Sequence, residues 1–510
     1  MSNPGSDELA VSVAPAVTLA HAETGKLVAR NTLYLTVSQA LTVPLSILTN
    51  VVVARYLGPD AFGLSYLAYT LCAFGFLIVS WGHDGVLPAV VARDHSQSGL
   101  MLGSSLAFRS ALTVPVYAAM AIGSYLFGYG RDLQWILGLT TLHQLFTAYA
   151  AGGKDTIRGL ERMRVPAYAH VGQQLLVAAF VIPIVMLGGQ LRAAVAAQGA
   201  ACAVILIYVW RGLGPAGVNK LRVSWAATKV LFRGGTPFVV SGLVMSLQPM
   251  IDAMYLSKLT SPEVIGWYAV SRRLVGVLLF PASALIGALY PTLCRLWASD
   301  RPLFAQTSSG SLRSVSLVVV PVMLGTALYA DVAIAMFNRQ AFGPTADDLR
   351  VLSVFIALVY FSMPLGSCVL AADRQRAWSI VQSLCLVTSL VLDPLLVPYF
   401  QRRYGNGGLG VCLASVLSEF TVVICGILLS PRGVFDRKFA RVFLLSLAAG
   451  AVLVFVARLT SSISPFIGGP LALIAYVLTL LLTGGIEKET VEKLRGAVQR
   501  RLGRGTGSGG

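Results

Sequence analysis

Residues 33–80 read LYLTVSQALTVPLSILTNVVVARYLGPDAFGLSYLAYTLCAFGFLIVS and contain two apolar stretches separated by a short polar turn. A helix that crosses a bilayer needs about 20 mostly apolar residues, so this segment predicts two spanning helices joined by a tight turn. Stretches of the same kind recur along the whole chain, and they start near Leu33, Ala61, Ser104, Leu133, Pro166, Leu191, Gly235, Val264, Arg313, Asp347, Ala377, Gly407, Arg441 and Phe466. The sequence therefore predicts an all-α polytopic membrane protein with about fourteen transmembrane helices.

Composition supports a membrane protein and argues against an enzyme. The chain has 510 residues, of which 56% are hydrophobic and only 12% are charged. A soluble protein of this size keeps a mainly solvated exterior, which this composition does not supply. The sequence contains no GxxxxGK[ST] phosphate loop, no GxSxG and no HExxH, and no loop is long enough for a catalytic domain. We therefore expect no enzymatic activity, no cofactor and no metal centre.

The net charge of +17 is best explained by membrane topology. If Met1 is cytoplasmic, the inner loops and tails carry a roughly threefold excess of Lys and Arg over the outer loops, as the positive-inside rule requires. Both termini are therefore expected in the cytoplasm. The basic charge predicts attraction to anionic membrane lipids and gives no reason to expect a nucleic-acid partner.

Two turns of similar sequence suggest that a six-helix unit is duplicated. Residues 50–63, NVVVARYLGPDAFG, and residues 252–266, DAMYLSKLTSPEVIG, each place a polar residue in a span before a cation, a Pro-bearing turn and an apolar-Gly pair. Transporters are often built from such repeats, with the substrate site between them. The predicted organisation is a flexible tail (1–30), a six-helix bundle (31–212), an amphipathic linker (213–234), a second six-helix bundle (235–430), two further helices (431–485) and a basic tail (486–510).

Several motifs resemble those of a known family, and they occur in the family's order. The turn Ala54-Arg55-Tyr56-Leu57-Gly58-Pro59-Asp60-Ala61-Phe62-Gly63 is similar to the opening motif of polysaccharide biosynthesis proteins, the Wzx-type flippases. Further similar segments are residues 158–164, RGLERMR; residues 266–269, GWYA; residues 290–296, YPTLCRL; and residues 407–415, GGLGVCLAS. The resemblance covers most of the chain between residues 30 and 430.

The resemblance implies the multidrug/oligosaccharidyl-lipid/polysaccharide exporter superfamily, in which two pseudo-symmetric six-helix bundles surround a central cavity. Wzx-type members move polyprenyl-diphosphate-linked oligosaccharides across the bacterial inner membrane for exopolysaccharide, capsule or O-antigen synthesis. A polysaccharide polymerase and glycosyltransferases are the implied protein partners. The chain departs from the family in having fourteen predicted spans, where many members have twelve. It also has Asp393 where the family more often has Asn.

Three alternatives remain open at this point. Lipid II flippases of the same superfamily also have fourteen spans, so the cargo could be a peptidoglycan precursor. A cation-coupled drug or metabolite antiporter is expected to have acidic residues in a smaller apolar cavity. A membrane enzyme such as an O-antigen polymerase or ligase typically has a long outer loop, which this sequence lacks.

Cations inside the predicted spans are the candidate substrate-binding residues. A lipid-linked diphosphate must cross a medium in which ions are heavily penalised, and the planar fork of Arg suits phosphate oxygens. We expect Arg109, together with Arg272 or Arg273, to line a hydrated cavity. Neighbouring helical positions diverge by about 100°, so Arg272 and Arg273 cannot point the same way. The competing interpretation is that these side chains reach a membrane interface or pair with Asp252.

Asp252 is the candidate coupling or gating residue. A carboxylate inside a span can neutralise an Arg or can bind the Na⁺ or H⁺ whose gradient drives transport. A gating pair with Lys258 or Arg273 is the alternative for Asp252. We also assign Arg55 to gating, because it is expected to anchor the outer turn through hydrogen bonds to carbonyl groups.

Overall fold

The computed structural model describes residues 5–218, 220–461 and 464–485, which form α-helices, one short 3₁₀-helix (His95–Gln97) and no β-strand. Eleven helical segments among these residues are long and apolar enough to cross a membrane. One of the eleven, Leu41–Arg93, contains helical segments on both sides of a kink. Two further long helices, Arg131–Gly159 (29 residues) and Trp225–Leu259 (35 residues), are not among the eleven. The predicted all-helical membrane fold is confirmed, and about fourteen spans agree with these helices.

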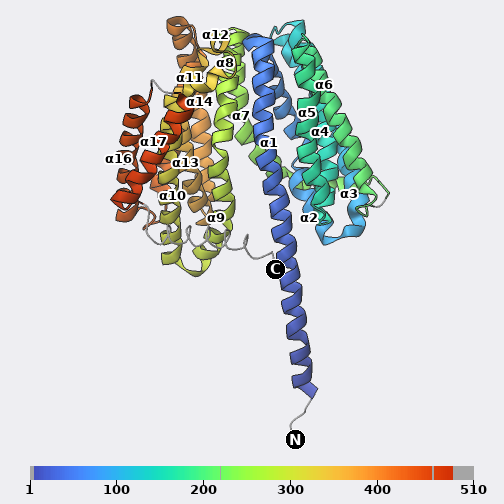
Figure 1. Cartoon of the computed structure of the whole chain (residues 1–510). Coiled ribbons are helices and arrows are strands. Elements are labelled where there is room, and N and C mark those ends of the chain that lie inside the picture. The colour runs from blue at the N-terminus through green and yellow to red at the C-terminus, as the bar shows by residue number, and fades with distance from the viewer. Residues whose placement is uncertain (1–4, 219, 462–463, 486–510) are drawn as a thin grey trace, which may run out of the picture. The chain divides into compact units, whose positions relative to one another are not determined.

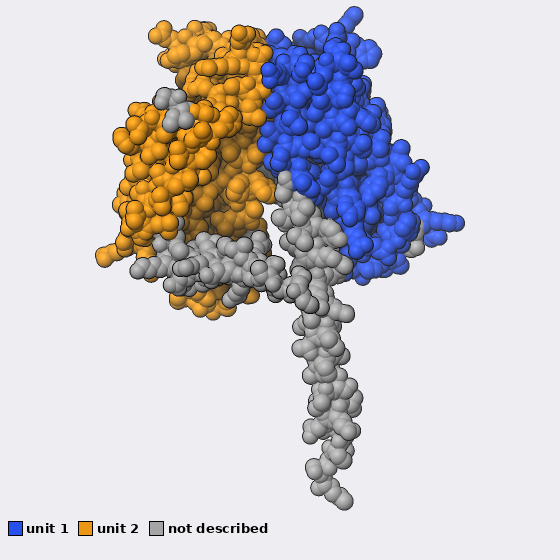
Figure 2. Space-filling view, viewed as in Figure 1, with its two compact units in different colours: residues 1–250 blue, residues 251–510 orange. Residues whose placement is uncertain are grey.

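The chain divides into two compact units, residues 1–250 and residues 251–510, which Figure 2 colours blue and orange. Figure 1 labels their helices. The helices of unit 1 are α1 (Gly5–Ser80), α2 (His83–Arg93), α3 (Ser98–Leu126), α4 (Arg131–Gly159), α5 (Arg164–Met186), α6 (Leu191–Leu213) and the first part of α7 (Trp225–Leu259).

The predicted turn between the first two spans is a kink within α1. Gly58 has φ 80° and ψ 172°, a conformation that residues with a Cβ rarely adopt. An added Cβ at Gly58 would meet no atom within 4 Å, so the backbone conformation, and not space, explains the glycine. Pro59 follows directly and suits the first position of the next helical segment.

A second break separates α1 from α2 and places the charged start of α2. Trp81 and Gly82 have φ angles of 45° and 64°, and the indole nitrogen of Trp81 donates to the carbonyl oxygen of Phe232 at 3.1 Å. A Cβ on Gly82 would lie 2.6 Å from the carbonyl oxygen of Gly235 on α7. The close approach of the two backbones therefore requires glycine, and it fixes where α2 begins.

The core of unit 1 forms where α4 packs against α2, α3 and α6, while α1 packs against α5. Its buried apolar residues include Leu87, Leu102, Ile157, Val209 and Leu231. These helices present apolar residues to one another, so any polar side chain among them must be satisfied by the protein or by a ligand.

Unit 2 contains the rest of α7 followed by α8 (Pro262–Leu278), α9 (Phe280–Ser299), α10 (Arg301–Leu328), α11 (Ala330–Ala335), α12 (Arg339–Phe342), α13 (Thr345–Ala371), α14 (Gln375–Tyr404), α15 (Gly408–Leu429), α16 (Arg437–Leu459) and α17 (Pro465–Thr483). Helix α13 is central to this unit, because it packs against α8, α9, α10 and α15. In its most apolar window 61% of residues are buried, the largest share among the eleven spans.

The Gly-rich motif at the start of α15 allows an intimate contact with α14. A Cβ on Gly410 would lie 2.7 Å from the backbone of Leu396 and Val397. The two helices therefore approach closely at this glycine, as small residues permit in membrane proteins. This contact fixes α14 against α15 within unit 2.

The two additional C-terminal helices, α16 and α17, pack against each other, and α16 packs along α10. The hydroxyl of Tyr476 on α17 donates to the carbonyl oxygen of Leu317 on α10 at 2.8 Å. Both helices are thus part of unit 2 and not a separate domain.

Two of the expected domain boundaries differ from the helix limits. Helix α1 begins at Gly5, so residues 5–30 of the expected flexible tail are helical. The second half of the expected linker is the beginning of α7, and the residues described between Gly214 and Ser224 contain no helix. The expected basic tail at 486–510 lies outside the described residues.

Candidate functional site

Unit 1 holds a buried cation, Arg109, on α3. Its side chain is 1% exposed and therefore does not reach a lipid interface. One terminal nitrogen donates to the carbonyl oxygen of Ala148 on α4, and the Nε atom has no hydrogen-bond partner among the described residues. Burying a charge with incomplete pairing is costly. Arg109 is therefore a candidate for binding an anionic ligand.

Arg109 lines a cavity of about 320 Å³ between α1, α2, α3 and α4. Two further cations, Lys154 and Arg158, and two carboxylates, Asp84 and Asp155, also line it. If all five side chains are ionised, the cavity carries one net positive charge. The structure thus places Arg109 in a polar cavity of unit 1, and neither Arg272 nor Arg273 is among the residues that line it.

Small residues on α4 make room for the guanidinium group. Residues 150–153 read AAGG, and a Cβ on Gly152 would lie 3.4 Å from a terminal nitrogen of Arg109. This run directly precedes Lys154 and Asp155, so the same helical turn provides both the space and the charges.

Asp155 organises the charges of the cavity. Its Oδ1 atom is 3.2 Å from Arg158, and its Oδ2 atom is buried without a hydrogen-bond partner among the described residues. Arg109 and Lys154 are also within electrostatic range of this carboxylate. An anionic ligand would therefore compete with Asp155 for the cations.

Lys154, Asp155 and Arg158 were not among the residues that the sequence predicted to line a cavity. In the structure α4 continues to Gly159. The available signal was the spacing of the charges, because Asp155 and Arg158 are three residues apart and therefore share one helix face. Arg55 is exposed near the Gly58 kink and does not line this cavity.

Unit 2 contains a second polar cluster, centred on Asp252 of α7. This carboxyl group is completely buried. Its Oδ2 atom accepts a hydrogen bond from the Tyr268 hydroxyl of α8 at 3.0 Å. Its Oδ1 atom lies 3.5 Å from the hydroxyl of Ser389 on α14.

Ser389 connects Asp252 to a second buried carboxyl, Asp393, which lies one turn further along α14. The Ser389 hydroxyl is 3.0 Å from Asp393 Oδ2, and Asp393 is 0% exposed. A serine hydroxyl has a single proton to donate, so it cannot hydrogen-bond to two ionised carboxylates at once. An additional proton, a bound cation or a nearby basic side chain would stabilise the pair.

Arg272 is near Asp252 and near a second, partly buried carboxyl group, Glu419 of α15. Its guanidinium carbon is 5.8 Å from the ring centre of Tyr268 and 5.2 Å from that of Phe355. Its positive charge is within electrostatic range of both carboxyl groups. The structure thus brings Asp252 and Arg272 together, which is the pairing that the sequence analysis kept as an alternative to substrate binding.

Arg273 is partly buried and follows Arg272 on the same helix, so its side chain leaves α8 in a direction about 100° away. Glu419 has its own hydrogen-bond donor, the hydroxyl of Ser362 on α13. The sequence predicted Asp252 as a carboxylate within a span but gave no sign of the bridging role of Ser389, because serine is common in membrane helices.

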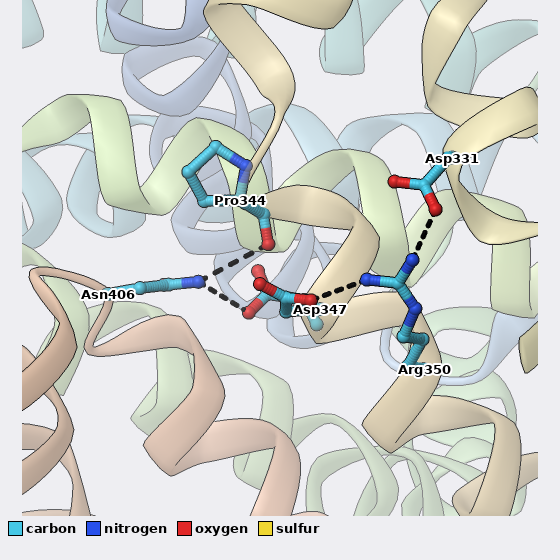
Figure 3. Close-up of polar contacts among 6 residues, drawn as sticks. Asp331, Pro344, Asp347, Arg350 and Asn406 are labelled. Atoms are coloured by element: carbon cyan, nitrogen blue, oxygen red, sulfur yellow. Dashed lines mark hydrogen bonds and ion pairs between the residues drawn. The ribbon is translucent and has the colours of Figure 1, made fainter.

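A third polar cluster lies at the start of α13 (Figure 3). Asn406, in the turn before α15, donates to the buried carboxylate of Asp348 at 2.9 Å and to the carbonyl oxygen of Pro344 at 3.4 Å. On the other side of the helix, Arg350 pairs with Asp347 at 2.6 Å and with Asp331 of α11. These contacts tie α11, α13 and the α14–α15 turn together, so we assign the cluster a structural role.

The fold is similar to those of solved membrane transporters. A lipid II flippase, MurJ, in an inward closed conformation, aligns with a TM-score of 0.69 at 13% identity, covering 90% of this chain and 99% of that chain. An inward-facing multidrug resistance MATE family transporter of the MOP superfamily aligns with a TM-score of 0.61 at 15% identity, covering 77% and 93%.

A third transporter of the MOP superfamily, from Pyrococcus furiosus, has a reported reverse polarity of its binding pocket that suggests a different function. It aligns with a TM-score of 0.51 at 17% identity, covering 78% of this chain and 94% of that chain. Identities this low show a shared fold and no more. No curated protein sequence matches this chain. The model of the polysaccharide biosynthesis proteins matches residues 28–297, more than half of the chain, which therefore belongs to that family.

Proposed function

We propose that this protein is a secondary flippase that moves polyprenyl-diphosphate-linked oligosaccharides across the bacterial inner membrane by alternating access. The observation that carries the proposal is the cavity of unit 1, where buried Arg109 lies with Lys154 and Arg158. The products would serve exopolysaccharide, capsule or O-antigen synthesis, together with glycosyltransferases and a polymerase. Both termini would face the cytoplasm, as the distribution of Lys and Arg favours.

The cavity chemistry suits the head group of such a lipid. A diphosphate carries about two negative charges, and its transfer into hydrocarbon without partners is prohibitively costly. The three cations can replace part of the water around the phosphates, and Arg can do so through two parallel hydrogen bonds. Asp84 and Asp155 limit the net charge, so the anion is not held so tightly that its release is prevented.

We further propose that the Asp252–Asp393 pair of unit 2 holds the coupling ion, either H⁺ or Na⁺. The Ser389 hydroxyl can donate to only one of the two carboxyl groups, so an added proton would stabilise the pair. The same oxygens, with the Tyr268 hydroxyl, also offer the hard oxygen ligands that alkali cations prefer. Arg272 then neutralises one remaining carboxylate when the ion leaves.

The flippase proposal is tested in proteoliposomes that contain a fluorescent lipid-linked oligosaccharide. Arg109→Gln and Lys154→Gln should each slow flipping by about tenfold or more, because a hydrogen bond to a charged group contributes roughly 1.5–3 kcal/mol. Arg192→Gln is the matched control, since Arg192 is 51% exposed and pairs with Asp132 at the surface. Normal flipping by both cavity variants at equal protein content would refute the proposal.

A peptidoglycan precursor is the second candidate cargo, and the similarity to MurJ over nearly the whole of that chain favours it. Lipid II also carries a diphosphate, so the cavity alone does not separate the two. The same proteoliposome assay with lipid II distinguishes them, because a faster rate for lipid II would reassign the substrate. A drug or metabolite antiporter fits less well, since a cavity with three cations disfavours cationic drugs.

A further inference from the structure

A second hollow of unit 1, which we call the α1–α5 groove, has an apolar lining. It has a volume of about 430 Å³ and is lined by Leu41, Pro44, Leu45 and Leu48 of α1 and by Val171 and Leu175 of α5. Helices α1 and α5 pack against each other. The residues from Leu41 to Leu48 extend over roughly 10 Å of helix, so the groove can follow a chain-like ligand for two helical turns.

One edge of the α1–α5 groove is polar. Thr42, which also lines the groove, has its hydroxyl 3.4 Å from Nε2 of His170 on α5. His170 directly precedes Val171, so the polar contact and the apolar wall are continuous along the chain.

The polar edge lies within electrostatic range of two side chains of the cationic cavity. Lys154 and Arg158 are both within electrostatic range of His170, and the same two side chains line the cavity that contains Arg109. Unit 1 thus has leucine side chains in the groove, a histidine at its edge, and positive charges within electrostatic range of that histidine. A lipid with a long apolar chain and an anionic diphosphate has an apolar part and a charged part that match these two regions.

We infer that the α1–α5 groove holds the first isoprene units of the polyprenyl chain while the diphosphate occupies the Arg109 cavity. This inference rests on the proposed function and adds the site of the tail. The apolar lining favours a hydrocarbon occupant, and the adjoining cations favour one whose apolar chain ends in a strongly anionic group. The groove thereby keeps the tail in contact with unit 1 as the head group enters the protein.

Binding of two probes separates the groove from the cavity. Undecaprenyl diphosphate has both parts of the ligand, whereas inorganic diphosphate has the head group alone, and affinities are measured for the full chain in lipid nanodiscs. Leu175→Trp fills the groove and should weaken binding of undecaprenyl diphosphate by about tenfold, with unchanged binding of inorganic diphosphate. Ala179→Trp is the control, because Ala179 is exposed one turn further along α5 and does not line the groove.

The outcomes distinguish failure of the inference from failure of the proposed function. Equal affinity of Leu175→Trp and Ala179→Trp for undecaprenyl diphosphate would overturn the groove assignment. Arg109→Gln should weaken both probes, and unchanged binding of inorganic diphosphate to that variant would instead count against the cationic cavity.

A crosslinking experiment covers the case in which Leu175→Trp does not fold. A photoreactive leucine analogue at position 48 is introduced into protein in vesicles of phosphatidylethanolamine and phosphatidylglycerol. Added undecaprenyl diphosphate should become crosslinked and should displace most phospholipid crosslinks. Persistent crosslinking of phospholipid alone would mean that the groove is an ordinary bilayer contact, which would refute the inference.

Discussion

Removal of a single hydroxyl group tests how the carboxyl pair of unit 2 is charged. In Tyr268→Phe the hydrogen bond of 3.0 Å to Asp252 Oδ2 is lost, while the buried ring remains. A hydrogen bond to an ionised group contributes roughly 1.5–3 kcal/mol, and one between neutral groups about 1 kcal/mol. The size of the destabilisation therefore reports whether Asp252 carries its charge.

Thermal unfolding in detergent provides the measurement. Five of the seven cysteines are buried, so a thiol-reactive fluorescent dye detects the loss of packing. For a unit of about this size, a loss of about 2 kcal/mol corresponds to a decrease in Tm of roughly 4–8 °C. Tyr360→Phe is the matched control, because its hydroxyl donates to the carbonyl oxygen of Leu278, a neutral acceptor.

Ion binding adds a second observable to the same experiment. A ligand present at about 100 times its Kd stabilises a protein by about 2.7 kcal/mol. If Asp252 and Asp393 hold Na⁺, added NaCl should raise the Tm of the wild type more than choline chloride does, and Asp393→Asn should abolish this difference. No difference between the salts favours H⁺ as the coupling ion. An unchanged Tm of Tyr268→Phe, together with wild-type ion dependence of Asp393→Asn, would refute the reasoning for this cluster.

Two further predictions concern packing and the cluster in Figure 3. Gly410→Ala should destabilise the protein by about 1–3 kcal/mol, since a Cβ there would lie 2.7 Å from the α14 backbone. Gly276→Ala is the control, because a Cβ at Gly276 would meet no atom within 4 Å. Equal thermal stability of the two variants would contradict the importance of the close α14–α15 contact. Asn406→Ala should cost about 1–3 kcal/mol by removing the donor to buried Asp348. A wild-type Tm for Asn406→Ala would show that this contact does not hold the start of α13.

The sequence predicted the features that depend on local order. Apolar length and the residues of the turns were sufficient for the helical spans, because a chain in lipid must satisfy its backbone within each helix. The turn predicted between the first two spans illustrates this, since α1 has its kink there, at Gly58. A buried cation was also predictable, because Arg109 stands out in an apolar stretch of α3.

Partners that come from other helices could not be predicted in this way. Ser389 is an ordinary residue of α14 until the packing of α7 brings Asp252 within 3.5 Å of its hydroxyl. Lys154 and Asp155 were likewise not predicted as cavity residues, and only the packing of α4 beside α3 makes them part of the lining of a charged cavity.

The sequence by itself determined that the chain is a helical membrane protein with rare charges inside its spans. Hydrophobic length and the high cost of ions in lipid are properties of individual segments, so they can be recognised without knowing the fold. Only the tertiary structure decided that Arg109 lines a cavity, that Arg272 is within electrostatic range of two carboxyl groups, and that His170, at the edge of the α1–α5 groove, is within electrostatic range of two cations of the cavity. The electrostatic energy of a charge depends on its distance from other charges, and those distances arise from helix packing between residues far apart in the chain.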